Sequence, residues 1–188
     1  MSLKKPRCVI YDIDGTIADS TVRATKHIDL VAKRKGHFQK YRDSLNVYSQ
    51  TCENDVTIPT GIKIVHGLAL AYDAVPVAVT ARGNNGRIPT LEWLIANLPW
   101  RVSNDLLIMR PEADDDPTGW VCHAPSEEYK EHVLAKLFED WTVCAAVDDH
   151  LGVCNMYKRN GIAALHVLYP DIDCFTAAGE HIAEPKAV

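Results

Sequence analysis

Val9-Ile10-Tyr11-Asp12-Ile13-Asp14-Gly15-Thr16 is the stretch of sequence that decides the fold. Its apolar part, which begins at Cys8, has the length of a strand that is buried on both faces. Two acids, Asp12 and Asp14, follow at once, and Gly15 permits a sharp turn after them. One such carboxylate can attack a phosphorus atom while the other handles protons. We predict that Asp12 is the nucleophile and that Asp14 is the general acid and base.

A calcium-binding loop also begins with Asp-x-Asp and is the main alternative for this segment. Such a loop requires glycine at its sixth position and glutamate at its twelfth. Here those positions hold Ile17 and Arg23, so we reject a calcium loop. The second acid close to Asp14 is expected to raise the pKa of Asp14, although a bound cation acts in the opposite direction.

Short apolar runs recur along the chain and alternate with helix-like stretches. The further runs are Val75–Val79, Leu106–Met109, Val143–Val147 and Ala163–Leu168. The helix-like stretches cover residues 60–72, 88–98, 126–139 and 151–160, and several are bounded by proline or glycine. This alternation predicts an α/β fold with a doubly wound, Rossmann-like parallel sheet of about five strands.

One part of the chain breaks this alternation, because a long interval separates Gly15 from the next helix-like stretch. We predict that residues 20–55 form a small helical cap lobe, inserted after the first strand of a single domain that spans residues 1–188. Apolar side chains recur in the lobe at helical spacing and more often pack than bind: Phe38, Tyr41, Leu45 and Tyr48. No strong periodicity follows Pro170, and Glu184–Val188 is expected to be frayed.

The charge of the chain is unevenly distributed. The 188 residues carry a net charge of −5, yet residues 21–42 hold seven Lys or Arg side chains against the single acid Asp29. That segment is therefore +6 and the remainder −11. A solvated helix face explains most such runs, but a basic surface near a phosphate site would attract anions. Hydrophobic residues at 47% and charged residues at 24% are typical of globular proteins and argue against disorder.

The cysteines are scattered without a Cys-x-x-Cys pair: Cys8, Cys52, Cys122, Cys144, Cys154 and Cys174. We interpret them as free thiols in a reducing compartment. The basic start, Met1–Arg7, precedes an apolar run that is too short for a signal peptide or a membrane span. The sequence therefore favours a cytoplasmic protein with no membrane segment, and it indicates no obligate protein partner.

Chemically useful side chains follow four of the predicted strands. In chain order they are Asp12 and Asp14, Thr80 and Arg82, Arg110, and Asp148 and Asp149. Because ligands of open α/β sheets bind outside the carboxyl ends of the strands, we expect these residues to line one crevice. So many acids would repel a phosphate without a cation, and an all-oxygen ligand set suits Mg²⁺. Its predicted ligands are Asp12, the backbone carbonyl of Asp14 and one acid of the Asp148-Asp149 pair.

Two further residues complete the predicted site. Thr80 is expected to hydrogen-bond a phosphoryl oxygen, and Lys130 to offset charge in the transition state, with Lys136 as the fallback. Each assignment has a structural alternative. Thr80 could simply end a strand, and Lys130 could lie on a helix surface. Arg82 could lie on an exposed loop, and the acid pair could cap the helix that starts near Leu151. The joint order of these residues favours the site.

The motifs in this order resemble those of the haloacid dehalogenase superfamily, whose phosphatases carry Asp-x-Asp-Gly-Thr, then Thr or Ser, then Lys, then paired acids. The resemblance covers residues 7–168. Within that superfamily the chain looks like the 3'-phosphatase domains of phage-type polynucleotide kinases. The segments that carry this likeness are His37–Tyr48 with Ile58-Pro59, Val79-Thr80-Ala81-Arg82, Leu107-Ile108-Met109-Arg110-Pro111 and Val147-Asp148-Asp149.

The resemblance implies a magnesium-dependent phosphomonoesterase that forms an aspartyl-phosphate and removes a terminal 3'-phosphate from a polynucleotide. It also implies that Asp149 meets Mg²⁺ directly, that Asp148 acts indirectly, and that Arg82 and Arg110 support the substrate. The basic segment fits a nucleic-acid end as the partner. The acidic remainder favours the alternative, a 5'(3')-nucleotidase or small-metabolite phosphatase. A phosphate- or nucleotide-binding module without turnover is disfavoured, because no core position is replaced.

Three features depart from the family pattern. His150 stands where the family often has arginine, and a histidine at a helix start is more often structural than catalytic. The segment between Arg110 and Lys130 is several residues longer than usual, and its loop 112–125 holds Trp120, which could stack on a base or pack within the loop. The sequence contains no Gly-x-x-x-x-Gly-Lys-[Ser/Thr] loop, so a kinase half is not expected.

Overall fold

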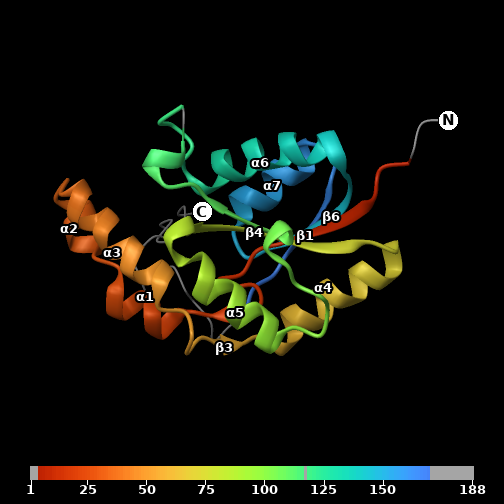
Figure 1. Ribbon diagram of the computed structural model, residues 1–188, viewed down its shortest axis with the longest axis horizontal. Coiled ribbons are helices and arrows are strands. Elements are labelled where there is room, and N and C mark those ends of the chain that lie inside the picture. Colours follow the sequence, from red (N-terminus) through yellow and green to blue (C-terminus); the bar gives the residue numbers. More distant parts are fainter. Residues whose placement is uncertain (1–3, 117, 170–188) are drawn as a thin grey trace, which may run out of the picture.

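Figure 1 shows a computed structural model of the protein, which describes residues 4–116 and 118–169. At its centre is a five-stranded sheet in the order β5-β4-β1-β6-β7, in which all neighbouring strands are parallel. The strands are β1 Arg7–Tyr11, β4 Val75–Gly83, β5 Leu107–Arg110, β6 Thr142–Asp148 and β7 Ala163–His166. The predicted doubly wound α/β fold is confirmed.

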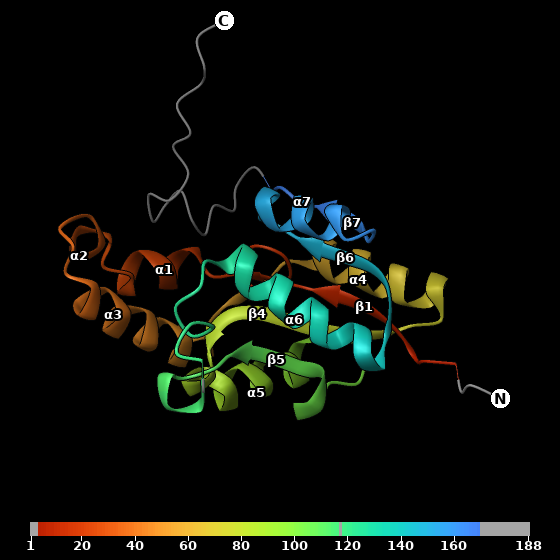
Figure 2. The same ribbon diagram turned by 90° about the horizontal axis from the view of Figure 1, so that it is seen from above.

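Helices cover both faces of this sheet (Figures 1 and 2). They are α4 Pro59–Tyr72, α5 Arg87–Asn97, α6 Ser126–Asp140 and α7 Leu151–Arg159. One core cluster joins the sheet to α6 and α7 through residues such as Ile10 and Leu134, and a second joins it to α4 and α5 through residues such as Tyr11 and Trp93. Successive residues of β1 thus point to opposite faces, as expected of a central strand.

The pairing of the strands sets the position of the first acid. Ile10 lies between Val77 of β4 and Ala146 of β6 in the sheet. The backbone N–H of Asp12 still donates to the carbonyl oxygen of Val147 at 3.0 Å, which continues the β1–β6 pairing beyond the end of β1. Asp12 therefore leaves the sheet beside the end of β6, where the second pair of acids begins.

The chain between β1 and α4 forms three helices and a small ribbon. The helices are α1 Thr21–His27, α2 Leu30–Arg34 and α3 Phe38–Gln50. The antiparallel strands β2 Ala18–Asp19 and β3 Val56–Thr57 flank them, a ribbon that the sequence pattern did not predict. In α3 the predicted apolar face is only partly covered, since Tyr48 is buried whereas Phe38 is 62% exposed. Packing therefore involves the carboxyl end of α3.

The end of α3 lies directly against the core. A Cβ atom added at Gly86, in the 3₁₀ turn Asn84–Gly86, would lie 2.1 Å from the carbonyl oxygen of Ser49. The N–H of Gly83 also donates to Ser49 Oγ at 3.0 Å. This close approach seats the lobe of residues 20–55 on the turn that follows β4. Two further 3₁₀ turns cover Asn104–Leu106 and Ala113–Asp115.

Helix α4 offers a matched pair of glycines for testing how the first loop packs. A Cβ atom at Gly61 would lie 1.8 Å from the carbonyl oxygen of Thr16, whereas nothing lies within 4 Å of one at Gly67. We expect Gly61→Ala to lower the free energy of unfolding by about 2 kcal/mol, because backbone must shift. Gly67→Ala should raise it by about 0.5 kcal/mol, because alanine is the better helix former. Urea denaturation measures both values, and equal effects would contradict the close packing of α4 on this loop.

The described residues contain free thiols and offer no helix that could cross a membrane. The cysteines that the structure describes are all free, and Cys8, Cys52 and Cys154 are buried. Within residues 4–116 and 118–169, none of the helices combines the length and the apolar character that crossing a membrane requires. Cys174 and the predicted frayed segment Glu184–Val188 lie outside the described residues.

Candidate active site

The carboxyl ends of β1 and β6 bring three acids together. Carboxylate oxygens of Asp12, Asp148 and Asp149 lie within 4.8 Å of one another. Asp12 and Asp148 are buried, at 8% and 1% exposure, and Asp149 is partly buried. Thr80 of β4 is also buried. The acids that follow β1 and β6 thus lie together, as expected for parallel strands that end at the same edge of a sheet.

Lys130 joins two of the acids. Its Nζ atom lies 3.1 Å from Asp12 Oδ1 and donates to Asp148 Oδ2 at 2.7 Å. Burial opposes the charge of Lys130, but the two carboxylates outweigh it and raise the pKa of Lys130 well above its ordinary value. At 2% exposure it is no surface lysine. Lys136, the fallback, is exposed on the same helix.

The positive charge of Lys130 does not fully compensate the negative charges of the clustered acids. Burial raises the pKa of Asp12 to about 7, and although Lys130 opposes this shift, Asp148 and Asp14 add to it. Burial, with Asp148 and Asp12 nearby, also raises the pKa of Asp149 well above its ordinary value. Buried carboxylates this close together are ionised at neutral pH only when cations compensate them. The cluster is therefore suited to binding a cation.

The unused oxygens of the cluster favour a magnesium ion. Among the described residues, two oxygens of the cluster, Asp12 Oδ1 and Asp149 Oδ1, are buried without a hydrogen bond, although Asp12 Oδ1 lies 3.1 Å from Lys130 Nζ. Carboxylate oxygens are the ligands that Mg²⁺ prefers, so the residues fit this ion. Asp148 differs from Asp149, because its two oxygens accept from Lys130 and from the N–H of His150. This favours Asp149 as the direct ligand and Asp148 as the residue that orients Lys130.

Gly15 shapes the loop that faces Asp149. Its φ of +71° lies in the left-handed region, and a Cβ atom there would lie 2.2 Å from Asp149 Oδ2. Only glycine leaves room for the carboxylate at this conformation. Gly15 of the Asp-x-Asp-Gly segment is thus needed twice, for the turn after Asp14 and for the space that the Asp149 carboxylate occupies.

Asp14 is held by two arginines. Arg82 Nε donates to Asp14 Oδ2 at 2.8 Å, and the Nη2 atoms of Arg82 and Arg23 donate to Oδ1 at 2.7 and 2.8 Å. Burial acts to raise the pKa of Asp14, but the two guanidinium groups outweigh it and hold the pKa below its ordinary value. The expectation that a neighbouring acid raises this pKa is therefore wrong, because two guanidinium groups pair directly with the Asp14 carboxylate.

The two predicted substrate-binding arginines both donate to protein groups. Arg82 is fully buried at its side chain, so it is not an exposed loop arginine. Arg110 donates to the carbonyl oxygens of Ala81, Val121 and Ala124, and its guanidinium lies 4.7 Å from the centre of the Tyr129 ring. Arg110 thereby fixes the end of segment 112–125 to the sheet. Contact of either arginine with substrate stays a prediction.

The helix after the paired acids is capped by His150. Its Nδ1 atom accepts from the N–H of Val153 at 3.3 Å, and His150 is the N-cap residue of α7. Neither acid of the pair occupies that position, so capping does not account for them. The structural interpretation of His150 agrees with this contact.

Comparisons with known proteins place the fold. No protein-family model matches the sequence, and no curated protein matches it. A chain in the structure of a Pnkp1/Rnl/Hen1 complex has a TM-score of 0.59 at 20% identity, with 89% of this chain and 47% of that chain covered. A haloacid dehalogenase-like family hydrolase from Streptococcus pneumoniae has a TM-score of 0.51 at 11% identity, with 87% and 85% covered. The chain has the haloacid dehalogenase fold.

A third similar structure is the class C acid phosphatase from Bacillus anthracis, with a TM-score of 0.50 at 16% identity. The comparison covers 81% of this chain and 55% of the phosphatase. This chain thus spans about half the length of the Pnkp1-complex chain and of the acid phosphatase. At these identities the likeness concerns the fold alone, so the activity must be argued from the site.

In this haloacid dehalogenase fold, segment 112–125 touches the lobe of residues 20–55. Arg42 Nη1 of α3 lies 3.1 Å from His123 Nε2. Trp120 is 46% exposed and meets the ring of His132 edge-on, with the ring centres 6.0 Å apart. Trp120 thus contacts α6, which favours packing over base stacking.

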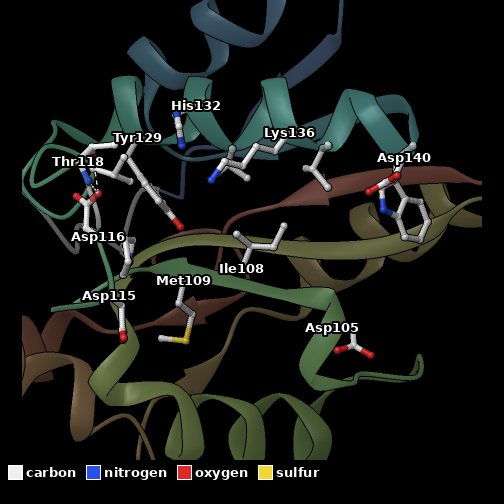
Figure 3. Close-up of a pocket in the computed structure, with 15 residues that line it drawn as sticks. Asp105, Ile108, Met109, Asp115, Asp116, Thr118, Tyr129, His132, Lys136 and Asp140 are labelled. Carbon is white, nitrogen blue, oxygen red and sulfur yellow. Dashed lines mark hydrogen bonds between the residues drawn. The ribbon is translucent and has the colours of Figure 1, made fainter. Parts of the chain in front are cut away.

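A cavity of about 500 Å³ lies between α6 and β5 (Figure 3). Tyr129, His132 and Lys136 line it from α6, and Ile108 and Met109 from β5. None of the acids in the cluster at the end of β1 and β6 is among its lining residues. Tyr129 and Lys130 are neighbours in sequence, yet Lys130 contacts the acids while Tyr129 faces this cavity. Lys136 is consequently placed at the cavity and not at the acids.

Two residues of the site, Arg23 and Asp55, were not predicted from the sequence. In the sequence Arg23 is one of several cations in the basic segment, and no motif or spacing indicates that Asp55 belongs to the site. In the structure both side chains are buried beside Asp14. Asp55 lies 32 residues from Arg23 and 27 from Arg82 in the chain, so only the fold reveals these contacts.

Proposed function

We propose that this protein is a magnesium-dependent phosphomonoesterase that uses Asp12 as its nucleophile. The observation that carries the proposal is the cluster of Asp12, Asp148 and Asp149, with Lys130 in contact with the first two. A buried lysine beside a nucleophilic carboxylate offsets the negative charge that a phosphate brings. The fold, shared with an acid phosphatase, supports the same function.

The reaction follows from the chain's own residues. An oxygen of Asp12 forms a bond to phosphorus while the ester P–O bond breaks, and protonated Asp14 gives a proton to the departing oxygen. Because Arg23 and Arg82 lower the pKa of Asp14, this step needs the negative charge of the bound phosphate to raise that pKa again. Water then attacks the aspartyl-phosphate, Asp14 takes its proton, and inorganic phosphate leaves. Thr80 is proposed to hydrogen-bond a phosphoryl oxygen. Bound Mg²⁺ would be held by Asp12, Asp149 and the backbone carbonyl of Asp14, and it supplies neutralisation of the phosphate charge.

A polynucleotide 3'-end is the favoured substrate, as the resemblance of the motifs suggests. The support from structure is the basic segment 21–42, in which every Lys and Arg side chain except Arg23 is exposed or at the surface of the lobe. Lys40 pairs with Asp29 at 2.8 Å, which leaves several cations facing solvent. Such a surface attracts a phosphodiester backbone. The acidic remainder of the chain favours free nucleotides or sugar phosphates as the alternative.

A substrate panel with Mg²⁺ tests the proposal. We expect faster phosphate release from a 3'-phosphorylated oligonucleotide than from a 5'-phosphorylated one, from mononucleotides or from sugar phosphates. Removal of Mg²⁺ by a chelator should abolish turnover. If only sugar phosphates were hydrolysed rapidly, a polynucleotide would not be the substrate. No turnover of any phosphomonoester would remove the enzymatic claim.

The role of the basic segment needs a charge-matched comparison. Arg34→Glu with Lys35→Glu changes two exposed residues of the lobe, and Lys63→Glu with Lys158→Glu changes two exposed residues outside it. We expect only the first pair to lower kcat/KM for the oligonucleotide. It should also flatten the salt dependence by roughly 0.7 in logarithmic slope for each backbone phosphate that the variant no longer binds. If the two double variants lowered kcat/KM equally, the oligonucleotide would respond to the overall charge of the protein and the lobe would not be a binding surface.

A further inference from the structure

Four buried charges form one cluster beside the acids of the site. We call Asp14, Arg23, Asp55 and Arg82 the charge clamp. The exposed fractions of the side chains are 8% for Asp14, 5% for Arg23, 2% for Asp55 and 0% for Arg82. Two acids and two arginines make the clamp neutral, which is what allows so many charges to be buried together.

Asp55 holds both arginines from the side opposite Asp14. Its Oδ1 atom accepts from Arg23 Nε at 2.8 Å. Its Oδ2 atom accepts from Arg23 Nη2 at 2.6 Å and from Arg82 Nη2 at 3.0 Å. The same two Nη2 atoms also donate to Asp14 Oδ1. Each guanidinium therefore lies between two carboxylates, and loss of either carboxylate removes one of the groups that orient it.

The clamp joins the lobe of residues 20–55 to the core. Arg23 belongs to α1, and its guanidinium lies 3.8 Å from the centre of the Tyr48 ring in α3 and donates to the Tyr48 carbonyl. Arg82 belongs to β4. Asp55 lies where the chain returns from the lobe, and its carbonyl oxygen accepts from Trp93 Nε1 in α5 at 2.9 Å. The position of the lobe and the orientation of Asp14 thus depend on the same contacts.

We propose that Asp55 is a positioning residue for the reaction. By holding Arg23 and Arg82 it fixes the position of the Asp14 carboxylate, the proposed proton donor, and it links that position to the packing of the lobe on the core. This inference rests on the proposed phosphatase function. A proton donor acts efficiently only when it is held within a fraction of an ångström of its working position, which is the reason for a clamp of four residues.

The leaving group provides the test. An alkyl phosphate needs protonation of its departing oxygen, whereas 4-nitrophenyl phosphate leaves as a stable phenolate and needs little. We expect Asp55→Asn to lower kcat/KM for the alkyl ester, a nucleoside 3'-phosphate, about 100-fold. The kcat/KM of Asp55→Asn for 4-nitrophenyl phosphate should stay within about threefold of the wild-type value. Because both values come from one sample, their ratio does not depend on the fraction of protein that is folded.

Two further variants complete the experiment. Asp43→Asn makes the same change at an exposed site of α3 and should leave the ratio unchanged. Asp14→Asn combined with Asp55→Asn should be no slower on the alkyl ester than Asp14→Asn alone, because Asp55 acts through Asp14. Equal loss on both esters in Asp55→Asn, or additive losses in the double variant, would overturn the positioning role. If the wild-type protein hydrolyses neither ester with Mg²⁺, the proposed function itself fails and this inference falls with it.

Discussion

Replacing Asp12 with asparagine is expected to lower kcat for any phosphomonoester by at least about 1,000-fold. The amide is no nucleophile, so the aspartyl-phosphate cannot form. The fold should survive, because asparagine has the same shape and removes a charge from a cluster in which burial and the acids Asp148 and Asp14 raise the pKa of Asp12. Phosphate release under saturating substrate measures the first effect, and thermal unfolding measures the second.

The stability measurement separates loss of chemistry from loss of fold. Without Mg²⁺, the unfolding temperature of Asp12→Asn should be no lower than that of the wild type, since a buried repulsion is relieved. Added Mg²⁺ should raise it less than in the wild type, because one proposed ligand is gone. Asp105→Asn, at an exposed position before β5, is the matched control and should keep full activity. Unchanged turnover in Asp12→Asn would sink the assigned nucleophile.

The strands and the acids were predictable because both depend on local pattern. Each apolar run predicted a strand of the sheet, and the residues after β1 and β6 meet because parallel strands end at one edge. The ends of strands were less accurate. Strand β4 continues to Gly83, beyond the predicted Val79, because Thr80 pairs with Met109 of β5 and, after a break in register, Gly83 pairs with Arg110.

The contacts of the arginines were not predictable in the same way. The sequence shows Arg82 after a strand, but whether its guanidinium faces substrate or Asp14 depends on Asp55, which lies 27 residues away in the chain. Likewise Arg110 looked available for a phosphate, and its backbone partners come from segment 112–125, whose path has no periodic pattern. Pairings of this kind depend on how loops return to the core, which one sequence does not encode in its spacing.

Lys130→Met is expected to affect stability as strongly as activity. Methionine matches the length of the lysine stem but leaves Asp12 and Asp148 without their shared cation. Breaking a buried pair on one side costs about 3 kcal/mol, so the free energy of unfolding at pH 8 should fall by about that amount. The deficit should be smaller at pH 6 than at pH 8, because protonated Asp12 no longer needs the cation. Since Lys130 opposes the rise of the Asp12 pKa to about 7, that pKa lies higher still in the variant, and the deficit shrinks between that higher value and about 7. Urea denaturation at several pH values measures it.

Lys136→Met is the matched control, because it makes the same change at an exposed residue of α6 that lines the cavity in Figure 3 and does not contact the acids. Its effect on stability should stay within about 0.5 kcal/mol, and its activity should be unchanged. Lys130→Met should lower kcat/KM at least about 100-fold, since charge in the transition state is no longer offset. Mg²⁺ should recover part of its stability, because the cation neutralises the same carboxylates, but not its turnover. If Lys130→Met kept full activity and Lys136→Met lost it, Lys136 would be the residue that offsets charge in the transition state, and the contacts of Lys130 with the acids would have no catalytic role.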